Sequence, residues 1–297
     1  MMPDLTITEA LNLSPTLPRL DREVLLSHVI GQDRVFLMAH GETELTPAQL
    51  KRYRTLLTRA TKHEPIAYIV GEKEFYGRKF FVGPGVLIPR PETELLVEST
   101  RKKILTAAYK KKKIAIVDVG TGSSAIITSI FLSLNSAWQK NISWFAVDSE
   151  AAALRYARKN ARHHHVDKVR FIESDLLTKL SKRLSRYDEV FAIANLPYLS
   201  HALYQTTAPN VQHYEPKNAL VSGEDGLDHY RRLLEELRTL SQAGVKVNFS
   251  FEVSPEQARK LPSLFKDIYT LSTLEILPDL AQKMRVVMGT LDPKQTA

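Results

Sequence analysis

The sequence contains no cysteine among its 297 residues. This absence excludes disulfide bonds, thiolate catalysis and cysteine-ligated metals. No apolar run approaches the roughly 20 residues that span a bilayer, and residues 1–20 lack the basic stretch and apolar core of a signal peptide. The phosphate-binding pattern Gly-x-x-x-x-Gly-Lys-Ser/Thr is also missing, so a nucleoside triphosphatase is unsupported. We therefore expect a cytoplasmic protein with no membrane segment.

The composition is that of an ordinary globular protein with a basic charge balance. Hydrophobic residues make up 43% and charged residues 25% of the chain, which is long enough for one large domain or two smaller ones. The formal net charge of +8 is compatible with a polyanionic partner. We interpret the densest basic runs, residues 101–103 and 110–113, as solvated surface, because such runs usually are. Direct nucleic-acid binding is thus not favoured, and nothing requires more than a monomer.

The sequence pattern divides the chain into three parts. Residues 1–64 predict a small N-terminal helical domain, in which Thr46 is the N-cap and Pro47 the first residue of a helix. Residues 65–90 predict a β-hairpin linker, with short strands at 68–71, 74–77 and 79–82. Residues 91–297 open with a predicted helix at 93–105 and then alternate between apolar strands and amphipathic helices. This alternation predicts an α/β domain, with a parallel sheet covered by helices on both faces.

Within the α/β domain, the predicted elements are short and regularly spaced. The strands are expected at 114–119, 143–147, 169–172, 190–194 and 247–253, and the helices at 123–134, 150–162 and 227–241. We interpret residues 134–142 as a surface loop.

A glycine turn follows the first of these strands, in Asp118-Val119-Gly120-Thr121-Gly122. Ligands of open parallel sheets bind beyond the carboxyl ends of the strands. There Gly120 permits a tight turn and Gly122 lets the backbone approach a nucleotide-like cofactor. Asp118 is predicted to accept a hydrogen bond from the cofactor's amino group. Asp148 ends the next strand and is predicted to bind both ribose hydroxyls.

Asp175 follows a third strand, and two interpretations of it have equal weight. It is either an acceptor for the exocyclic amine of adenine or the N-cap of a helix.

An amide, a proline and an aromatic ring follow a further apolar run, in Asn195-Leu196-Pro197-Tyr198. The Asn195 side-chain oxygen and the Leu196 backbone carbonyl can each accept one N–H of a planar amino group. Pro197 disfavours the helical conformation at Leu196, which keeps that carbonyl extended, and Tyr198 offers a flat face. With the glycine turn, this predicts a methyltransferase that uses S-adenosylmethionine and acts on a planar nitrogen. Such nitrogens are poor nucleophiles, so catalysis is expected from positioning, and no general base is evident.

Three adjacent histidines, His163 to His165, suggest a metal site at first sight. Successive helical residues point in different directions, so one helix cannot easily direct all three at one ion. We interpret them as a polar helix end, and we expect no metal.

Several longer motifs resemble the release factor glutamine methyltransferases, the HemK/PrmC family. The matching segments are residues 64–71, 74–77, 86–94 (Val-Leu-Ile-Pro-Arg-Pro-Glu-Thr-Glu), 195–198, 214–220, 226–227, 251–253, 279–281 and 285–287. The resemblance runs from about residue 20 to 290 and implies a Rossmann-like class I methyltransferase domain with a mostly parallel seven-stranded sheet. It also implies methyl transfer from S-adenosylmethionine to the glutamine side-chain amide nitrogen in the Gly-Gly-Gln motif of class I peptide chain release factors.

The resemblance assigns expected roles to the site residues. Asn195, Pro197 and Tyr198 are the expected catalytic residues and, with Leu196, hold the glutamine amide. The glycine turn with Thr121, together with Asp118, Asp148, Asp175 and Asn195, is expected to bind the cofactor. The sequence does not determine whether the N-terminal helices bind the release factor or only brace the hinge, and we favour binding.

Two further residues are predicted as walls of the cleft, Arg90 and Phe75. For Phe75, packing within the hairpin is an alternative of equal weight.

Two positions depart from the family's usual pattern. Leu196 stands where the family usually has proline, and Asn-Leu-Pro-Tyr also resembles the rRNA adenine dimethyltransferases. A nucleic-acid N-methyltransferase is therefore the alternative enzyme. Ser124 stands where the cofactor loop usually has a third glycine, and its side chain is expected to crowd helix packing or the cofactor. A binding module that has lost cofactor affinity is the non-enzymatic alternative.

Overall fold

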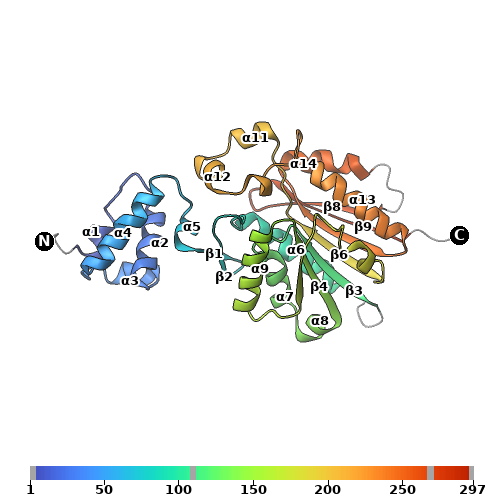
Figure 1. Cartoon of the computed structure of the whole chain (residues 1–297), viewed down its shortest axis with the longest axis horizontal. Coiled ribbons are helices and arrows are strands. Elements are labelled where there is room, and N and C mark those ends of the chain that lie inside the picture. The colour runs from blue at the N-terminus through green and yellow to red at the C-terminus, as the bar shows by residue number, and fades with distance from the viewer. Residues whose placement is uncertain (1–4, 108–111, 266–270, 294–297) are drawn as a thin grey trace. The chain divides into compact units, whose positions relative to one another are not determined.

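The computed structural model describes residues 5–107, 112–265 and 271–293. Their contacts divide the chain into two units, whose elements are labelled in Figure 1. The first unit lies within Met1–Glu72, Val82–Pro84 and Ala208–Glu215, and the second within Lys73–Phe81, Gly85–Thr207 and Pro216–Ala297. No helix in the described ranges is both long and apolar enough to cross a membrane.

The first unit is helical and extends beyond the predicted domain of residues 1–64. Its helices are α1 (Ile7–Ala10), α2 (Arg19–Ile30), α3 (Arg34–Ala39), α4 (Pro47–Ala60), α5 (Ile66–Val70) and α12 (Pro209–Tyr214). Leu25, Leu26 and Tyr53 are among the buried residues of its core. The predicted start of α4 is confirmed, because the Thr46 hydroxyl accepts from the Gln49 amide at 3.2 Å while the Gln49 side chain caps Thr46 in return.

The linker contains two of the three predicted strands. These are β1 (Glu72–Phe75) and β2 (Arg78–Phe81), joined by Tyr76 and Gly77, which both have positive φ, as a tight hairpin turn requires. The strand predicted at 68–71 is wrong, since this segment belongs to helix α5. Pro65 precedes this helix, and Gly71 ends it with φ +84°. The proline before this segment and the glycine after it favour a helix, although the residues between them are typical of strands.

The second unit is built on a seven-stranded, mostly parallel sheet, which confirms the predicted α/β fold. The strands are β3 (Ile114–Val119), β4 (Ile142–Asp148), β5 (Val169–Glu173), β6 (Glu189–Ala194), β7 (Lys246–Glu252), β8 (Leu271–Pro278) and β9 (Met284–Leu291). Their order is β5-β4-β3-β6-β7-β9-β8, with only the pairings of β9 antiparallel. Strand order reverses beside β3, where α/β folds bind ligands.

Helices cover both faces of this sheet. The helices of this unit are α6 (Glu94–Leu105, after a 3₁₀ turn at Pro91–Thr93), α7 (Ala125–Ser133), α8 (Ser136–Asn141), α9 (Ala151–His163), α10 (Ser181–Leu184), α11 (His201–Gln205), α13 (Asp228–Gln242) and α14 (Pro255–Lys260), with short 3₁₀ turns at Lys217–Ala219 and Leu261–Phe265. Alternate residues of β3 enter two separate cores: Val117 packs in the core that includes α13, and Ile116 in the core that includes α6 and α7. Central strands buried on both faces explain the continuous apolar runs in the sequence.

The surface loop predicted at 134–142 is wrong. Helix α8 occupies this segment, because the Asn135 side chain caps it by accepting from the amides of Ala137 at 3.1 Å and Trp138 at 3.2 Å. The Trp138 ring is buried and anchors the helix to the core that includes α6 and α7.

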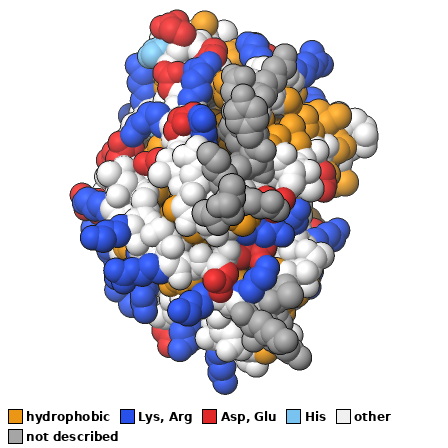
Figure 2. All heavy atoms as spheres, turned by 90° about the vertical axis from the view of Figure 1, so that its right-hand side faces the viewer, with side chains coloured by type: hydrophobic (Ala, Val, Ile, Leu, Met, Phe, Trp, Pro, Cys, Tyr) orange, Lys and Arg blue, Asp and Glu red, His pale blue; other side chains and the backbone are white. Residues whose placement is uncertain are grey.

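The basic runs are only partly described. Residues 110 and 111 lie outside the described ranges, and Lys112 pairs with the buried Glu189 at 3.2 Å. Figure 2 shows Lys and Arg side chains spread over one face of the molecule, with acidic side chains between them.

Candidate active site

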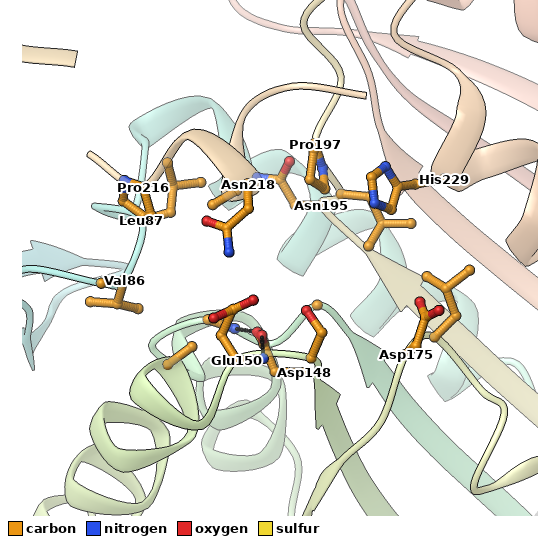
Figure 3. Close-up of a pocket in the computed structure, with 18 of the residues that line it drawn as sticks. Val86, Leu87, Asp148, Glu150, Asp175, Asn195, Pro197, Pro216, Asn218 and His229 are labelled. Carbon is orange, nitrogen blue, oxygen red and sulfur yellow. Dashed lines mark hydrogen bonds between the residues drawn. The ribbon is translucent and has the colours of Figure 1, made fainter. Parts of the chain in front are cut away.

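A cavity opens where β3, β4 and β6 end (Figure 3). The lining combines residues that the sequence predicts for a cofactor with residues that it predicts for an acceptor; they include Val86, Gly120, Gly122, Asp148, Asp175, Asn195, Leu196 and Pro197. The carboxyl ends of the strands thus bring the two predicted groups into one pocket.

The glycine turn forms the floor between β3 and β4. The amides of Gly120 and Thr121 both donate to the Val147 carbonyl at 2.9 Å, which holds the turn against β4. Gly120 and Gly122 have φ of +71° and +53°, a region that favours glycine. A Cβ on Gly120 would lie 2.8 Å from Leu196 Cδ2, so glycine also makes room for the leucine of the acceptor loop.

Asp148 is placed as predicted, at the end of β4 and in the cavity lining. Its Oδ2 accepts from the Gly122 amide at 2.8 Å, and its Oδ1 accepts from the Glu150 amide at 2.9 Å. Burial raises the pKa of Asp148, while these amides oppose the shift. Each carboxylate oxygen can accept a second hydrogen bond, so Asp148 can bind a diol.

Asp118, near the end of β3, and Thr121, within the turn, are buried and do not line the cavity, which contradicts their predicted contacts with the cofactor. The Thr121 hydroxyl donates to Asp118 Oδ2 at 2.7 Å. In the described part of the chain, Asp118 Oδ1 is buried and has no hydrogen-bond partner. Burial raises the pKa of Asp118 to about 7. The structure therefore places an unsatisfied acid just below the backbone that the cofactor is expected to approach.

Asp175 lines the far side of the cavity from Val86 and pairs with Arg232 of α13 at 2.5 Å (Figure 3). The alternative that it caps a helix is wrong, because the next helix, α10, begins at Ser181 and has Leu180 as its N-cap.

The acceptor loop contributes Asn195, Leu196 and Pro197 to the lining. The Asn195 Nδ2 donates to the Thr93 hydroxyl at 3.2 Å. The Leu196 amide donates to the Tyr230 hydroxyl at 3.2 Å, and that hydroxyl donates to the Glu252 backbone carbonyl. The Asn195 side chain and the Leu196 amide are therefore each hydrogen-bonded to a buried residue.

Tyr198 and Arg90 lie outside the cavity lining. The Tyr198 carbonyl accepts from Gln257 Nε2 at 2.5 Å, and its amide donates to the Leu220 carbonyl at 3.1 Å. Burial raises the pKa of Tyr198, and the charge of Arg90 opposes the shift. The two side chains therefore lie within electrostatic reach of one another behind the acceptor loop.

Phe75 does not form a wall of the cleft. It is 1% exposed and meets the Phe80 ring edge-on, with centroids 6.1 Å apart. This contradicts its predicted binding role and supports the hairpin-packing alternative.

Ser124 does not crowd the cavity, because it is fully buried and absent from the lining. Its φ of +64° is in the left-handed region, and its hydroxyl lies 3.2 Å from Thr128 Oγ1 and 3.3 Å from the Ala157 carbonyl. The expected interference with the cofactor is therefore wrong: the side chain bridges the start of α7 to α9.

Several lining or supporting residues were not predicted from the sequence. Asn218 and His229 line the cavity from segments far along the chain. Asn218 lies in the matching segment 214–220, to which the resemblance assigns no role in the site, and no local pattern marks His229. Thr93 and Glu252 support Asn195 from behind. Glu252 could have been found from the sequence, since it ends an apolar strand as Asp148 does.

The histidine run ends helix α9, as predicted. His163 packs against Phe81 and His164 against Phe80, with ring centroids 5.0 and 4.8 Å apart. Over the ranges that the structure covers, no three His, Cys, Asp or Glu residues are grouped to hold a metal ion.

Comparison with known proteins gives matches along nearly the whole chain. A family model described as the PrmC N-terminal domain matches residues 7–71, and a methyltransferase domain model matches residues 110–221. The release factor glutamine methyltransferase of Bacillus cereus is 34% identical over 270 residues, covering 91% of this chain and 92% of that protein. The protein of the same name from Nitratidesulfovibrio vulgaris is 35% identical over 275 residues, covering 92% and 88%.

A solved structure of the hMettl16 catalytic domain with the MAT2A 3′UTR hairpin 6 is similar in fold. It has a TM-score of 0.54 at 15% identity and covers 84% of this chain and 83% of its own.

Proposed function

Because the chain belongs to the release factor glutamine methyltransferase family, we propose that it methylates one defined atom of its substrate. That atom is the side-chain amide nitrogen of the glutamine in the Gly-Gly-Gln motif of class I peptide chain release factors. The enzyme is an S-adenosylmethionine-dependent protein-glutamine methyltransferase. The observation that carries the proposal is the single cavity that joins the glycine turn and Asp148 to Asn195, Leu196 and Pro197.

The cavity fits S-adenosylmethionine by the chemistry of its residues. The two oxygens of Asp148 suit a ribose diol, and Gly120 and Gly122 expose backbone where a side chain would intrude. Asp175 suits the adenine amine, whereas Asp118 is buried behind the lining and supports the glycine turn through its hydrogen bond with Thr121. When bound, S-adenosylmethionine supplies an activated methyl group.

The acceptor loop binds and orients the planar amide. Asn195 Oδ1 accepts one N–H of the glutamine side chain, and the Leu196 carbonyl accepts the other. Two acceptors fix the direction in which the nitrogen faces, which is the main contribution available for a weak nucleophile. The methylated nitrogen then loses a proton, so no strong base is required.

Leu196 retains the fixed geometry that a proline would give. A proline has no amide hydrogen, whereas the Leu196 N–H is held by the Tyr230 hydroxyl at 3.2 Å. Its side chain is 3% exposed and lies over Gly120. This hydrogen bond and this packing restrict the backbone at Leu196, as a proline ring would do.

The N-terminal unit is proposed to bind the release factor. The match of residues 7–71 to the PrmC N-terminal domain supports this, as do the exposed apolar side chains of Val35 and Met38, which are 71% and 66% exposed. We expect Met38→Glu to raise KM for the release factor without changing affinity for S-adenosylmethionine. An unchanged KM would argue against this surface.

The test of the proposed function is methyl transfer from labelled S-adenosylmethionine to a purified class I release factor. Parallel reactions contain a release factor with Gln→Ala in its Gly-Gly-Gln loop and bare rRNA. We expect label on the wild-type factor only. Label on the RNA would support a nucleic-acid N-methyltransferase instead.

Asn195→Ala is the matched enzyme variant. We expect it to abolish transfer while S-adenosylmethionine still raises Tm, because the ligand stabilises the native state that binds it. Full activity would contradict the role of Asn195. A wild-type protein whose Tm does not respond to the cofactor would support a binding module.

A further inference from the structure

A buried acid lies beside the acceptor loop. Strands β6 and β7 are parallel, with Ala194 aligned with Phe251, so Asn195 and Glu252 follow at neighbouring positions. Glu252 is 2% exposed, and its Oε2 has no hydrogen-bond partner among the residues that the structure describes. Burying an acid without full pairing is unfavourable, so its place behind Asn195 needs an explanation.

The Thr93 hydroxyl connects the two side chains. It accepts from Asn195 Nδ2 at 3.2 Å, and it lies close enough to the Glu252 carboxylate to lower the pKa of that acid. Thr93 is 3% exposed and immediately precedes helix α6, so its side chain is held in place. The connection therefore runs between three segments that are distant in sequence.

The chemistry of these groups sets the direction of the hydrogen bonds. An ionised carboxylate only accepts, and a hydroxyl has a single hydrogen. With Glu252 ionised, Thr93 donates to Glu252 and can only accept from Asn195. The Asn195 amide must then turn its NH₂ toward Thr93, which leaves Oδ1 pointing the other way.

We propose that Thr93 and Glu252 are positioning residues, which fix the Asn195 amide so that its oxygen faces the glutamine nitrogen. The inference rests on the proposed function. A flipped Asn195 would present N–H donors to the N–H groups of the substrate, and the hydrogen bond on which binding depends would be lost.

The state of Glu252 depends on its charged neighbours. Burial raises its pKa to about 7; Thr93, Arg285 of β9 and Arg90 oppose the shift, and Glu92 adds to it. Tyr198, after β6, and Tyr230, of α13, also face it. When protonated, Glu252 can donate to Thr93, which then donates to Asn195 and favours the flipped amide. The acid is ionised above its pKa, so transfer should fall as pH falls through about 7.

The experiment measures kcat for release factor methylation from pH 6 to pH 8.5. Thr93→Val removes the hydroxyl at nearly constant shape and is expected to lower kcat about tenfold or more, the effect of one oriented hydrogen bond. Thr93→Ser keeps the hydroxyl and should restore most of the rate. Glu252→Gln should lower the high-pH rate and abolish the fall near pH 7. All three should bind S-adenosylmethionine within twofold of wild type.

Glu92→Gln is the matched control. It removes a negative charge near Glu252 without touching Asn195, so the fall in rate should shift to lower pH while the high-pH rate is retained.

Two results would overturn the inference: a wild-type kcat in Thr93→Val, or a wild-type rate and pH profile in Glu252→Gln. A loss of Tm alone, with kcat and profile unchanged, would show a structural role and also overturn it. No labelling by the wild-type enzyme would overturn the proposed function together with this inference. Normal labelling with unaffected variants would overturn the inference alone.

Discussion

Removing a single oxygen from Tyr230 should destabilise the acceptor loop. The hydroxyl accepts from the Leu196 amide at 3.2 Å and donates to the Glu252 backbone carbonyl. Tyr230 is fully buried, which raises its pKa well above the ordinary value and keeps the hydroxyl protonated. Tyr230→Phe preserves the ring and removes both hydrogen bonds.

The magnitude follows from the groups that lose a partner. The buried Leu196 N–H is left unsatisfied, at a cost of about 1–3 kcal/mol, and the loss of a donor to the carbonyl adds about 1 kcal/mol. Together they lower the free energy of unfolding by about 2–4 kcal/mol. For a domain of roughly 150–250 residues, this lowers Tm by roughly 4–16 °C.

Urea unfolding and calorimetry measure both quantities. The matched control is Tyr156→Phe on α9, since Tyr156 is half-buried and no hydrogen bond of its hydroxyl is described; a change within about 0.5 kcal/mol is expected. We also expect Tyr230→Phe to lower kcat more than cofactor affinity, because Leu196 supplies an acceptor to the substrate. A stability like that of the control would refute the reasoning.

Three further variants test the cofactor side of the site. Asp148→Ala should weaken S-adenosylmethionine binding by about 1–3 kcal/mol in calorimetry, and unchanged affinity would move the ribose contact elsewhere. Ser124→Gly should leave that affinity equal to wild type or slightly tighter, because relief of the positive φ offsets two lost contacts outside the cavity; weaker binding would contradict this. Asp118 has a pKa raised by burial to about 7, so its ionisation destabilises the fold as pH rises from about 4 to 7. In urea titrations, the free energy of unfolding of Asp118→Asn should therefore exceed that of wild type at pH 8, and by less at pH 5. An equal difference at both pH values would contradict the predicted pH dependence.

The sequence predicts those features that depend on neighbours along the chain. Strand β3 is buried over its whole length, so its apolar run reveals it. The Thr46 cap and the Gly120 turn likewise depend on a few adjacent residues and on one backbone conformation. Asp148 is predictable because the carboxyl end of a parallel strand fixes where its last side chain lies.

Other features depend on packing between distant segments and could not be predicted. The pattern around Phe75 fits a ligand wall and a core residue equally well, and only its burial in the core that includes α6 and α7 decides between them. From the sequence alone, the Ser124 side chain is expected to crowd the cofactor or the helix packing. Only the position of α9 shows that its hydroxyl instead reaches the Ala157 carbonyl. In both cases the determining contact joins elements whose relative placement is absent from the local sequence.

Acids at strand ends show most clearly where local pattern stops being informative. Asp148 and Glu252 each end an apolar strand of one sheet, and Asp118 is the last residue but one of a third strand. Their partners then separate their roles. Asp148 accepts from two amides and lines the cavity, whereas Asp118 and Glu252 are buried behind it, each with a pKa raised to about 7 and with one oxygen that has no hydrogen-bond partner in the described part of the chain. The position of an acid along its strand thus determines where the acid lies. Its role depends on the neighbouring hydroxyl, which belongs to the glycine turn for Asp118 (Thr121) and contacts the Asn195 amide for Glu252 (Thr93).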